Sequence, residues 1–326
     1  MKRFLRIAFI VMLVAAMSAG GVASARPANY PSRPIRIIVP FGAGGITDTI
    51  ARTFAASLSD KLQTSVVIEN LAGGAGAVGM NMLALARPDG YTLILTPSGP
   101  AVLTPLHSEV GYTYREFAPI ANLSDVPNVL AVRADSGIED LAGFIDFARN
   151  NPGAATVSTS GFGISQHMTM ELLAMLLDEP GLITIINFDG GAEARMALMG
   201  GQVKASMTSQ MDAAPSILDG SFIGIAVTSS QRTEQFPDVP TFLESGFNID
   251  SEVWHGLAAP ANTPQEIITF LSDTAGEVMQ LPIIKERFGV LGLPITFMPY
   301  GPFSERWVAE YRFNSEIVAR LRESAQ

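Results

Sequence analysis

The sequence has no cysteine and only three histidines in 326 residues. The absence of cysteine excludes disulfides, thiolate nucleophiles, iron–sulfur clusters and cysteine zinc sites. The histidines, His107, His167 and His255, are well separated in the sequence. We therefore expect no metal site and no cofactor.

Positive charge is also scarce, with 21 Lys and Arg residues against 31 Asp and Glu residues. The formal net charge is −10 at pH 7, which makes the chain poorly suited to binding nucleic acid or an anionic membrane surface. We expect no nucleic-acid partner, and an anionic ligand would have to be attracted by local groups. Hydrophobic residues make up 48% of the chain, which favours a folded globular protein over a disordered one.

Long uninterrupted apolar runs are absent beyond the N-terminus. The N-terminus has the basic residues Lys2 and Arg3, then the apolar run Ile7–Met17, then small residues ending at Ala25. The apolar core of about eleven residues is too short to span a bilayer, and the order of these parts is typical of a cleavable export signal. We predict a signal peptide over residues 1–25, cleavage after Ala25 and export of the mature protein.

After this signal, short β-rich runs alternate with helical runs. Strands of the first series are expected at Ile35–Val39, Ser65–Glu69 and Tyr91–Thr96, and helices at Thr47–Gln63 and Ala77–Ala86. The second series has strands at Val129–Val132, Thr156–Thr159, Leu182–Phe188, Ala205–Thr208 and Ile223–Thr228, and helices at Ile138–Asn150, Ser165–Leu177 and Ala192–Met199. The last part has a strand at Val253–Ala258 and helices at Pro264–Met279 and Ser304–Leu321. This alternation predicts mostly parallel sheets with helices on both faces.

Two α/β lobes with more than one crossing between them fit this order better than separate domains in a row. The chain has no internal repeat and no low-complexity linker. Trp254 and His255 lie where the chain is expected to cross between lobes. We expect Trp254 to pack in a core, with a cleft wall or a hinge as the alternative.

Five loops that follow strands could carry a ligand. They are Phe41–Asp48, Leu71–Gly79, Pro97–Pro100, Ser160–His167 and Phe188–Gly191. Glycine lets a ligand approach the backbone closely, and a helix that starts directly afterwards adds unpaired N–H groups and the positive end of its dipole. Any one of these loops could be a plain tight turn, but together they indicate a binding site.

Two glycine-rich segments lack the context of a nucleotide site. Gly74–Gly79 matches G-x-G-x-x-G, which would require an acidic residue about 20 residues on, at the end of the next strand. That strand instead ends in Leu95-Thr96-Pro97-Ser98. The loop Phe41–Asp48 is not followed by the Gly-Lys-Ser/Thr of a P-loop.

Catalytic patterns are incomplete. Gly163–His167 stops short of G-x-S-x-G because His167 occupies the last position. Ser165 and His167 are two residues apart at a helix start and should point in different directions, so His167 is expected to make a first-turn polar contact or to line a cleft. Asp48 could be a general base or a carboxylate favourably placed at a helix N-terminus. An exported hydrolase or isomerase that uses Asp48 and Ser165 stays as the alternative function.

Segments spread over nearly all of the mature chain carry a family resemblance. They are, in order, YPSRPIRIIVPFGAGGITDTIAR, VVIENLAGGAGAVG, ARPDGYTLIL, SDVPNVLAV, GFGISQH, GGAEARMALMGGQV, FPDVPTFLESGF and WHGLAAPANTP. In this order they resemble the substrate-binding proteins of tripartite tricarboxylate transporters, also called the Bug family.

The resemblance implies a two-lobed α/β fold of the periplasmic-binding-protein type (type II-like) with the ligand cleft between the lobes. We place lobe 1 at residues 26–124 and 252–326 and lobe 2 at residues 125–251. The resemblance also implies a receptor in the periplasm that closes over a small organic carboxylate. Such a receptor delivers its ligand, chemically unchanged, to the membrane permease subunits of a tripartite tricarboxylate-type transporter. A ligand-capturing partner of a sensor is a third alternative on the same scaffold.

The resemblance further implies that the loop Phe41–Asp48 and the loops of lobe 2 hold a ligand carboxylate, partly through water. The predicted ligand-binding residues are Phe41, Gly44, Gly45, Ile46, Thr47, Asp48, Ser98, Ser160, Gly163, Ser165, His167, Asp189 and Gly190. We expect the backbone N–H groups of residues 44–47 to receive the carboxylate.

The other predicted contacts would select the rest of the ligand. Ser98, Ser165 and His167 would meet its other end. Asp48 would hold a bridging water or a ligand ammonium group, because direct contact with a carboxylate would be repulsive. Phe188-Asp189 stands where the family usually has Tyr followed by a basic residue. This departure favours a ligand with an amino or hydroxyl group, or an aromatic acid, over a simple dicarboxylate.

Overall fold

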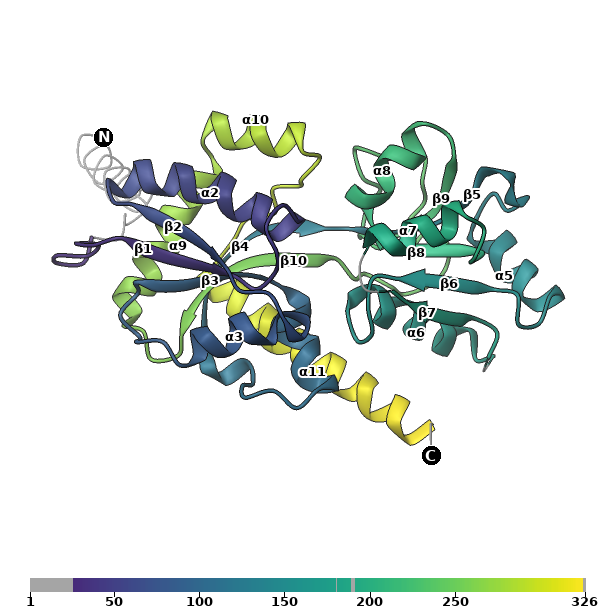
Figure 1. The fold of residues 1–326 in the computed structure, drawn as a ribbon, viewed down its shortest axis with the longest axis horizontal. Helices are drawn as coiled ribbons and strands as arrows, with labels where there is room; N and C mark the ends of the chain where they lie inside the picture. Colours follow the sequence, from purple (N-terminus) through teal and green to yellow (C-terminus); the bar gives the residue numbers. More distant parts are fainter. Residues whose placement is uncertain (1–25, 180, 189–190, 325–326) are drawn as a thin grey trace, which may run out of the picture.

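The computed structural model describes residues 26–179, 181–188 and 191–324. The predicted signal peptide and two predicted site residues, Asp189 and Gly190, lie outside the described residues. The chain forms two halves, each built around its own β-sheet, and extended strands run from one half to the other (Figure 1). We refer to the halves as lobe 1 and lobe 2.

The sheet of lobe 1 has six strands in the order β11-β4-β10-β3-β1-β2. They are β1 (Ile35–Val39), β2 (Val66–Asn70), β3 (Thr92–Pro97), β4 (Phe117–Val126), β10 (Val253–Pro260) and β11 (Met298–Pro299). β1 is parallel to β2 and β3, whereas β10 is antiparallel to β3 and β4.

The sheet of lobe 2 has five strands in the order β7-β6-β8-β5-β9. They are β5 (Asn128–Arg133), β6 (Thr156–Thr159), β7 (Thr184–Asn187), β8 (Ala205–Ser209) and β9 (Phe222–Val227). β6 is parallel to both of its neighbours, whereas β5 is antiparallel to both of its neighbours. The prediction of mostly parallel sheets is therefore wrong, because the strands that join the lobes enter each sheet in antiparallel pairs.

Helices pack on both sides of these sheets. They are α2 (Ile46–Leu62), α3 (Ala77–Ala84), α4 (Thr104–His107), α5 (Leu141–Asn150), α6 (Ser165–Leu177), α7 (Gly191–Met199), α8 (Gln210–Leu218), α9 (Gln265–Met279), α10 (Pro282–Val290) and α11 (Tyr300–Ser324). The bounds of β1, β6 and α6 are those predicted from the sequence. β4, α8 and α10 lie where no element was expected.

The lobe 1 sheet is covered on both faces because successive side chains of a strand point to opposite sides. Ile37 belongs to the buried cluster that includes Phe54 of α2, and Ile38 to the cluster that includes Trp307 of α11. Figure 1 draws α2 above this sheet and α3 and α11 below it. The expected layering of helices on both faces is thus present in lobe 1.

Two extended segments cross between the lobes. β4 continues through Val126-Pro127 into β5, and the chain after β9 leads back into β10. Strands of the first sheet come from residues 35–126 and 253–299, and strands of the second from residues 128–227. This division supports the lobe bounds given above, which stay a prediction.

The return crossing is anchored in the core of lobe 1. The Trp254 side chain is fully buried, with its ring centroid 5.1 Å from that of Phe303 and 4.8 Å from that of Trp307. The expected core packing of Trp254 is confirmed.

No single helix in the described part of the chain is both long and apolar enough to cross a membrane, and α9 and α10 reach that length and apolarity only as a pair bent by 69°. Most of the apolar face of α9 is buried in the lobe 1 core, as at Leu271 and Val278.

Candidate functional site

The loop after β1 leads directly into the N-terminus of α2. Gly44 has a φ of +86°, a conformation that favours glycine, whereas Gly45 is extended with a φ of −79° and caps the helix. The first amides of a helix have no partner within the helix, and no side chain caps α2. A Cβ on Gly44 would meet no atom within 4 Å. The start of α2 therefore faces open space with a partial positive charge.

The Asp48 side chain holds this loop against its neighbours by hydrogen bonds. Its Oδ2 accepts hydrogen bonds from the Gly44 N–H and from Arg52 Nε, both at 2.9 Å, and its Oδ1 accepts one from Asn70 Nδ2 at 2.9 Å. Burial alone would raise the pKa of Asp48, but the hydrogen bonds from Arg52, Gly44 and Asn70 lower it. Both oxygens of Asp48 thus bind protein donors, which makes the carboxylate a poor general base.

These contacts change one of the expected carboxylate donors, the backbone N–H groups of residues 44–47, which we call the amide cradle. The Gly44 N–H donates to Asp48, so it is not an unpaired donor as we expected from the sequence. The amides of Gly45, Ile46 and Thr47 stay as the candidates. Arg52 is turned toward Asp48 and also donates through Nη2 to Asn70 Oδ1 at 2.9 Å, so its charge is already matched.

The glycines of the G-x-G-x-x-G segment serve close packing. A Cβ on Gly76 would lie 2.4 Å from Pro100 Cγ, and one on Gly79 would lie 2.9 Å from Pro40 Cα. Only glycine fits at such distances. The segment therefore brings the loops after β1 and β3 together, which accounts for its glycines without a nucleotide.

In lobe 2, the loop after β6 touches lobe 1. Gly163 has a φ of +71°, and a Cβ there would lie 2.9 Å from His107 Cδ2 on α4. The Phe162 ring packs against two imidazoles, with its centroid 5.5 Å from that of His107 and 4.7 Å from that of His167. This loop is a contact between the lobes.

His167 is held as a neutral imidazole. Its Nδ1 accepts a hydrogen bond from the Gly163 N–H at 3.2 Å, which leaves the ring proton on Nε2, 3.4 Å from Glu171 Oε1. Burial, and then the neighbouring His107, lower the pKa of His167 to about 4. The expected first-turn polar contact is present.

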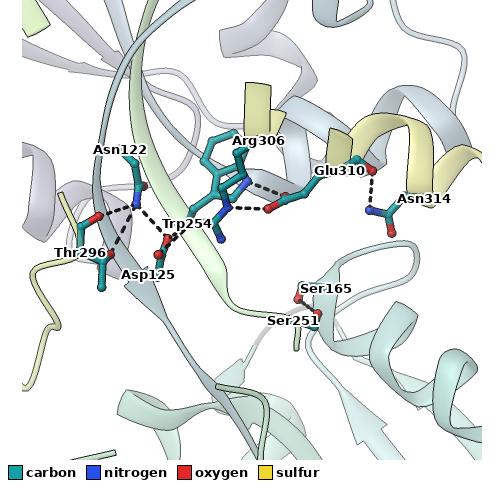
Figure 2. Close-up of polar contacts among 9 residues, drawn as sticks. All are labelled: Asn122, Asp125, Ser165, Ser251, Trp254, Thr296, Arg306, Glu310 and Asn314. Carbon is teal, nitrogen blue, oxygen red and sulfur yellow. Dashed lines mark hydrogen bonds and ion pairs between the residues drawn. The ribbon is translucent and has the colours of Figure 1, made fainter. Parts of the chain in front are cut away.

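Ser165 lies at the crossing between the lobes rather than beside a base. Its Oγ accepts a hydrogen bond from Asn128 Nδ2 at 3.2 Å. The same Oγ is 3.4 Å from Ser251 Oγ, as Figure 2 shows. Asn128 begins β5 on the outgoing crossing, and Ser251 precedes β10 on the return crossing. His167 and Asp48 have other partners among the described residues, so neither forms a serine–base pair with Ser165.

The remaining predicted residues are dispersed. Ser98 is buried at the end of β3 and lines a cavity of 410 Å³ between α6 and α11, together with Ser165. The Ser160 Oγ, at the end of β6, is buried without a hydrogen-bond partner among the described residues. Phe41 accepts a hydrogen bond from Asn70 Nδ2 at its carbonyl, 3.0 Å away.

A partly buried ion-pair network joins α11 to both crossings, and sequence reasoning missed it. Arg306 Nη1 donates to both oxygens of Asp125 at 2.9 Å, and its Nε donates to Glu310 Oε1 at 2.7 Å (Figure 2). Trp254 Nε1 donates to Glu310 Oε2 at 2.6 Å. Arg306 and Glu310 are an i,i+4 pair on α11, a spacing visible in the sequence, but Asp125 and Trp254 come from distant strands, so the sequence does not reveal that the four side chains meet.

Two cavities flank the crossings. One of 980 Å³ lies between the α8 side of lobe 2 and the segment from α10 to β11, and the other is the cavity of 410 Å³. Glu252, just before β10, lines both. Three or more His, Asp or Glu residues placed to hold a metal ion do not occur in the part of the chain that the structure describes.

Two α/β lobes joined by extended crossings, with glycine-rich loops at the strand ends between them, define a two-lobed solute-binding protein. Residues 50–298 match the family model described as "Tripartite tricarboxylate transporter family receptor". The chain belongs to this family of receptors, which includes the Bug proteins.

Named relatives agree with this assignment. Protein BugT of Bordetella pertussis is 32% identical over 279 residues, which cover 84% of this chain and 85% of BugT. The structure of R. palustris Rpa4515 with adipate matches with a TM-score of 0.78 and 27% identity, over 90% of this chain and 98% of that one. MatC from Rhodopseudomonas palustris with bound malate matches with a TM-score of 0.75 and 29% identity, over 89% of this chain and 100% of that one.

Proposed function

We propose that this protein is a periplasmic receptor that captures a small organic carboxylate between its lobes and passes it to a tripartite tricarboxylate-type permease. The observation that carries the proposal is the uncapped N-terminus of α2, which faces open space beside a carboxylate and an arginine that neutralise each other. Related proteins hold adipate and malate. Export through the predicted signal peptide would bring the receptor to the periplasm.

In this mechanism a ligand carboxylate binds to the amides of Gly45, Ile46 and Thr47. A helix N-terminus carries roughly half a positive charge, so it attracts an anion without a basic side chain. Closure of the lobes about the two crossings would then bring the loops of lobe 2 onto the other end of the ligand. The permease would recognise the closed form.

The enzyme alternative has little support. Asp48 is fully engaged by hydrogen bonds, and Ser165 contacts Asn128 and Ser251 rather than a base. Capture of a ligand for a sensor would use the same contacts as capture for a permease, so ligand identity alone does not separate these two roles.

The test is to identify a ligand and to recover it unchanged. Small molecules released from natively purified protein are identified by mass spectrometry, and a carboxylic-acid library is screened by thermal shift. A ligand at 100 times its dissociation constant should stabilise the fold by roughly 2.7 kcal/mol. Consumption of the best ligand would favour the enzyme, and a library without any stabilising acid would contradict the proposal.

A further inference from the structure

The first turn of α8 faces lobe 1. This helix begins at the end of β8, and its second residue, Met211, packs against the buried core of lobe 1. Figure 1 draws α2 and α8 on the same side of the molecule. The neighbouring residue, Asp212, is exposed and belongs to the same turn. Sequence reasoning placed no helix here and did not single out Asp212.

The Asp212 carboxylate is fixed against the start of α7. Its Oδ2 accepts from Ser209 Oγ at 3.0 Å, and the Asp212 N–H donates to the same Ser209 Oγ at 3.1 Å. This Oδ2 lies 2.6 Å from the position that a Cβ on Gly191 would take. Ser209 therefore orients the carboxylate, and glycine at position 191 leaves room for it.

Asp212 lacks a cationic partner of the kind that Asp48 and Asp125 have. Asp48 is paired with Arg52 and Asp125 with Arg306. No ion pair to Asp212 is found among the residues that the structure describes. Its negative charge is thus available to a ligand.

Ser160, which follows β6, also lies beside the start of α7. Its Oγ lies 3.5 Å from the Cβ position of Gly191 and is buried without a hydrogen-bond partner in the described structure. A buried polar atom that lacks a partner carries a desolvation cost. A hydroxyl without a partner and a carboxylate without a cation therefore converge on the start of α7, and both can accept a hydrogen bond.

We propose that Asp212 and Ser160 form a subsite for the ammonium group of an amino-acid ligand, an inference that rests on the proposed function. The start of α2 in lobe 1 receives the carboxylate, and the lobe 2 subsite receives the cation. A second carboxylate placed there would be repelled by Asp212. The start of α2 and the lobe 2 subsite together select an amino acid over the acid of the same length that lacks the amino group.

Matched ligand pairs test this inference by titration calorimetry. The probes are succinate and L-aspartate, adipate and L-2-aminoadipate, propionate and L-alanine, and 3-phenylpropionate and L-phenylalanine. For the pair that fits the cleft, the wild-type protein should bind the amino acid more than tenfold tighter than the acid without the amine. Asp212→Asn should lower this ratio at least tenfold, because it removes the charge and keeps the acceptor for Ser209.

Two further variants separate the subsite from general effects. Ser160→Ala should lower the ratio severalfold, and its thermal transition without ligand should match that of the wild type. Asp238→Asn, which removes an exposed carboxylate elsewhere in lobe 2, should leave the ratio unchanged. If Asp212→Asn does not fold, Ser160→Ala decides the matter.

The outcomes separate this inference from the proposed function. A wild-type preference for the unsubstituted acids, or a ratio that neither Asp212→Asn nor Ser160→Ala changes, would overturn the ammonium subsite and leave the carboxylate receptor intact. If no carboxylate of the panel or of the screened library binds, the proposed function fails and the subsite with it.

Discussion

Neighbouring glycines in the loop before α2 have different roles. Only Gly44 has a positive φ, whereas Gly45 has an extended backbone whose added Cβ would meet only Gly42 O at 3.8 Å. The sequence predicts the loop but does not distinguish the roles of these two glycines, since they are adjacent and of the same residue type. It likewise left two roles open for Asp48. The choice depends on Asn70, which reaches Asp48 from another strand.

Replacing Gly45 with Val should block the cradle without straining the backbone. We expect calorimetry with the identified ligand to show at least a tenfold loss of affinity. Arg52→Gln should change affinity less than threefold, because Asp48 keeps its bonds to Gly44 and Asn70. Normal binding by Gly45→Val together with lost binding by Arg52→Gln would replace the amide cradle with an arginine clamp.

Elements with a clear local pattern were predictable, and those that depend on partners were not. β1 reads Ile-Arg-Ile-Ile-Val and was found with its predicted bounds, as expected for a run of β-branched residues. β4 contains Pro119, Asn122 and Asp125, residue types that are depleted in strands. Asn122 is nevertheless buried, because its side chain donates to Asp125 and Thr296 (Figure 2).

The helix α8 was missed for a related reason. It carries Pro215 in its interior, which normally argues against a helix. The subsite residue Asp212 was missed with it. The predicted site of lobe 2 was therefore restricted to the loops after β6 and β7, although the start of α8 lies beside them.

The attachment of α11 to the crossings should contribute measurably to stability. Arg306→Gln removes the cation from the buried Asp125 and from the half-buried Glu310. Removing one partner of a buried ion pair lowers the free energy of unfolding by roughly 3 kcal/mol, and Asp125 should account for most of this loss. Arg36→Gln is the control, because its ion pair with Glu69 is 40% exposed on both sides and should contribute about 0–1 kcal/mol. Urea unfolding measures both variants. Equal losses would show that the Arg306 network is no more than a surface ion pair.

The crossings between the lobes carry an excess of negative charge. Asp125 lies on the outgoing crossing, Asp250 and Glu252 lie on the return crossing, and Arg306 already bonds to Asp125. Burial, then Asp125 and Asp250, raise the pKa of Glu252 to about 7, against an opposing effect of Arg306. Glu252 also lines both cavities beside the crossings. The region about which the lobes are proposed to close is thus sensitive to pH near neutrality.

This sensitivity has a definite sign. Between the ordinary glutamate value of 4.5 and about 7, the folded protein holds the Glu252 proton more tightly than the unfolded chain does. The free energy of unfolding should therefore fall as pH rises through this window. The loss should be on the order of 2 kcal/mol, after allowing for screening by solvent at a partly exposed group.

Glu252→Gln tests this prediction by urea unfolding at pH 5 and pH 8. The variant should resemble the wild type at pH 5, where Glu252 is protonated in the folded protein, and should be more stable than the wild type at pH 8, where the wild type carries the buried charge. Glu286→Gln, which removes an exposed carboxylate on α10, should have a small effect that is equal at both pH values. A Glu252→Gln variant whose stability differs from the wild type by the same amount at pH 5 and pH 8 would show that this carboxylate does not titrate near neutrality.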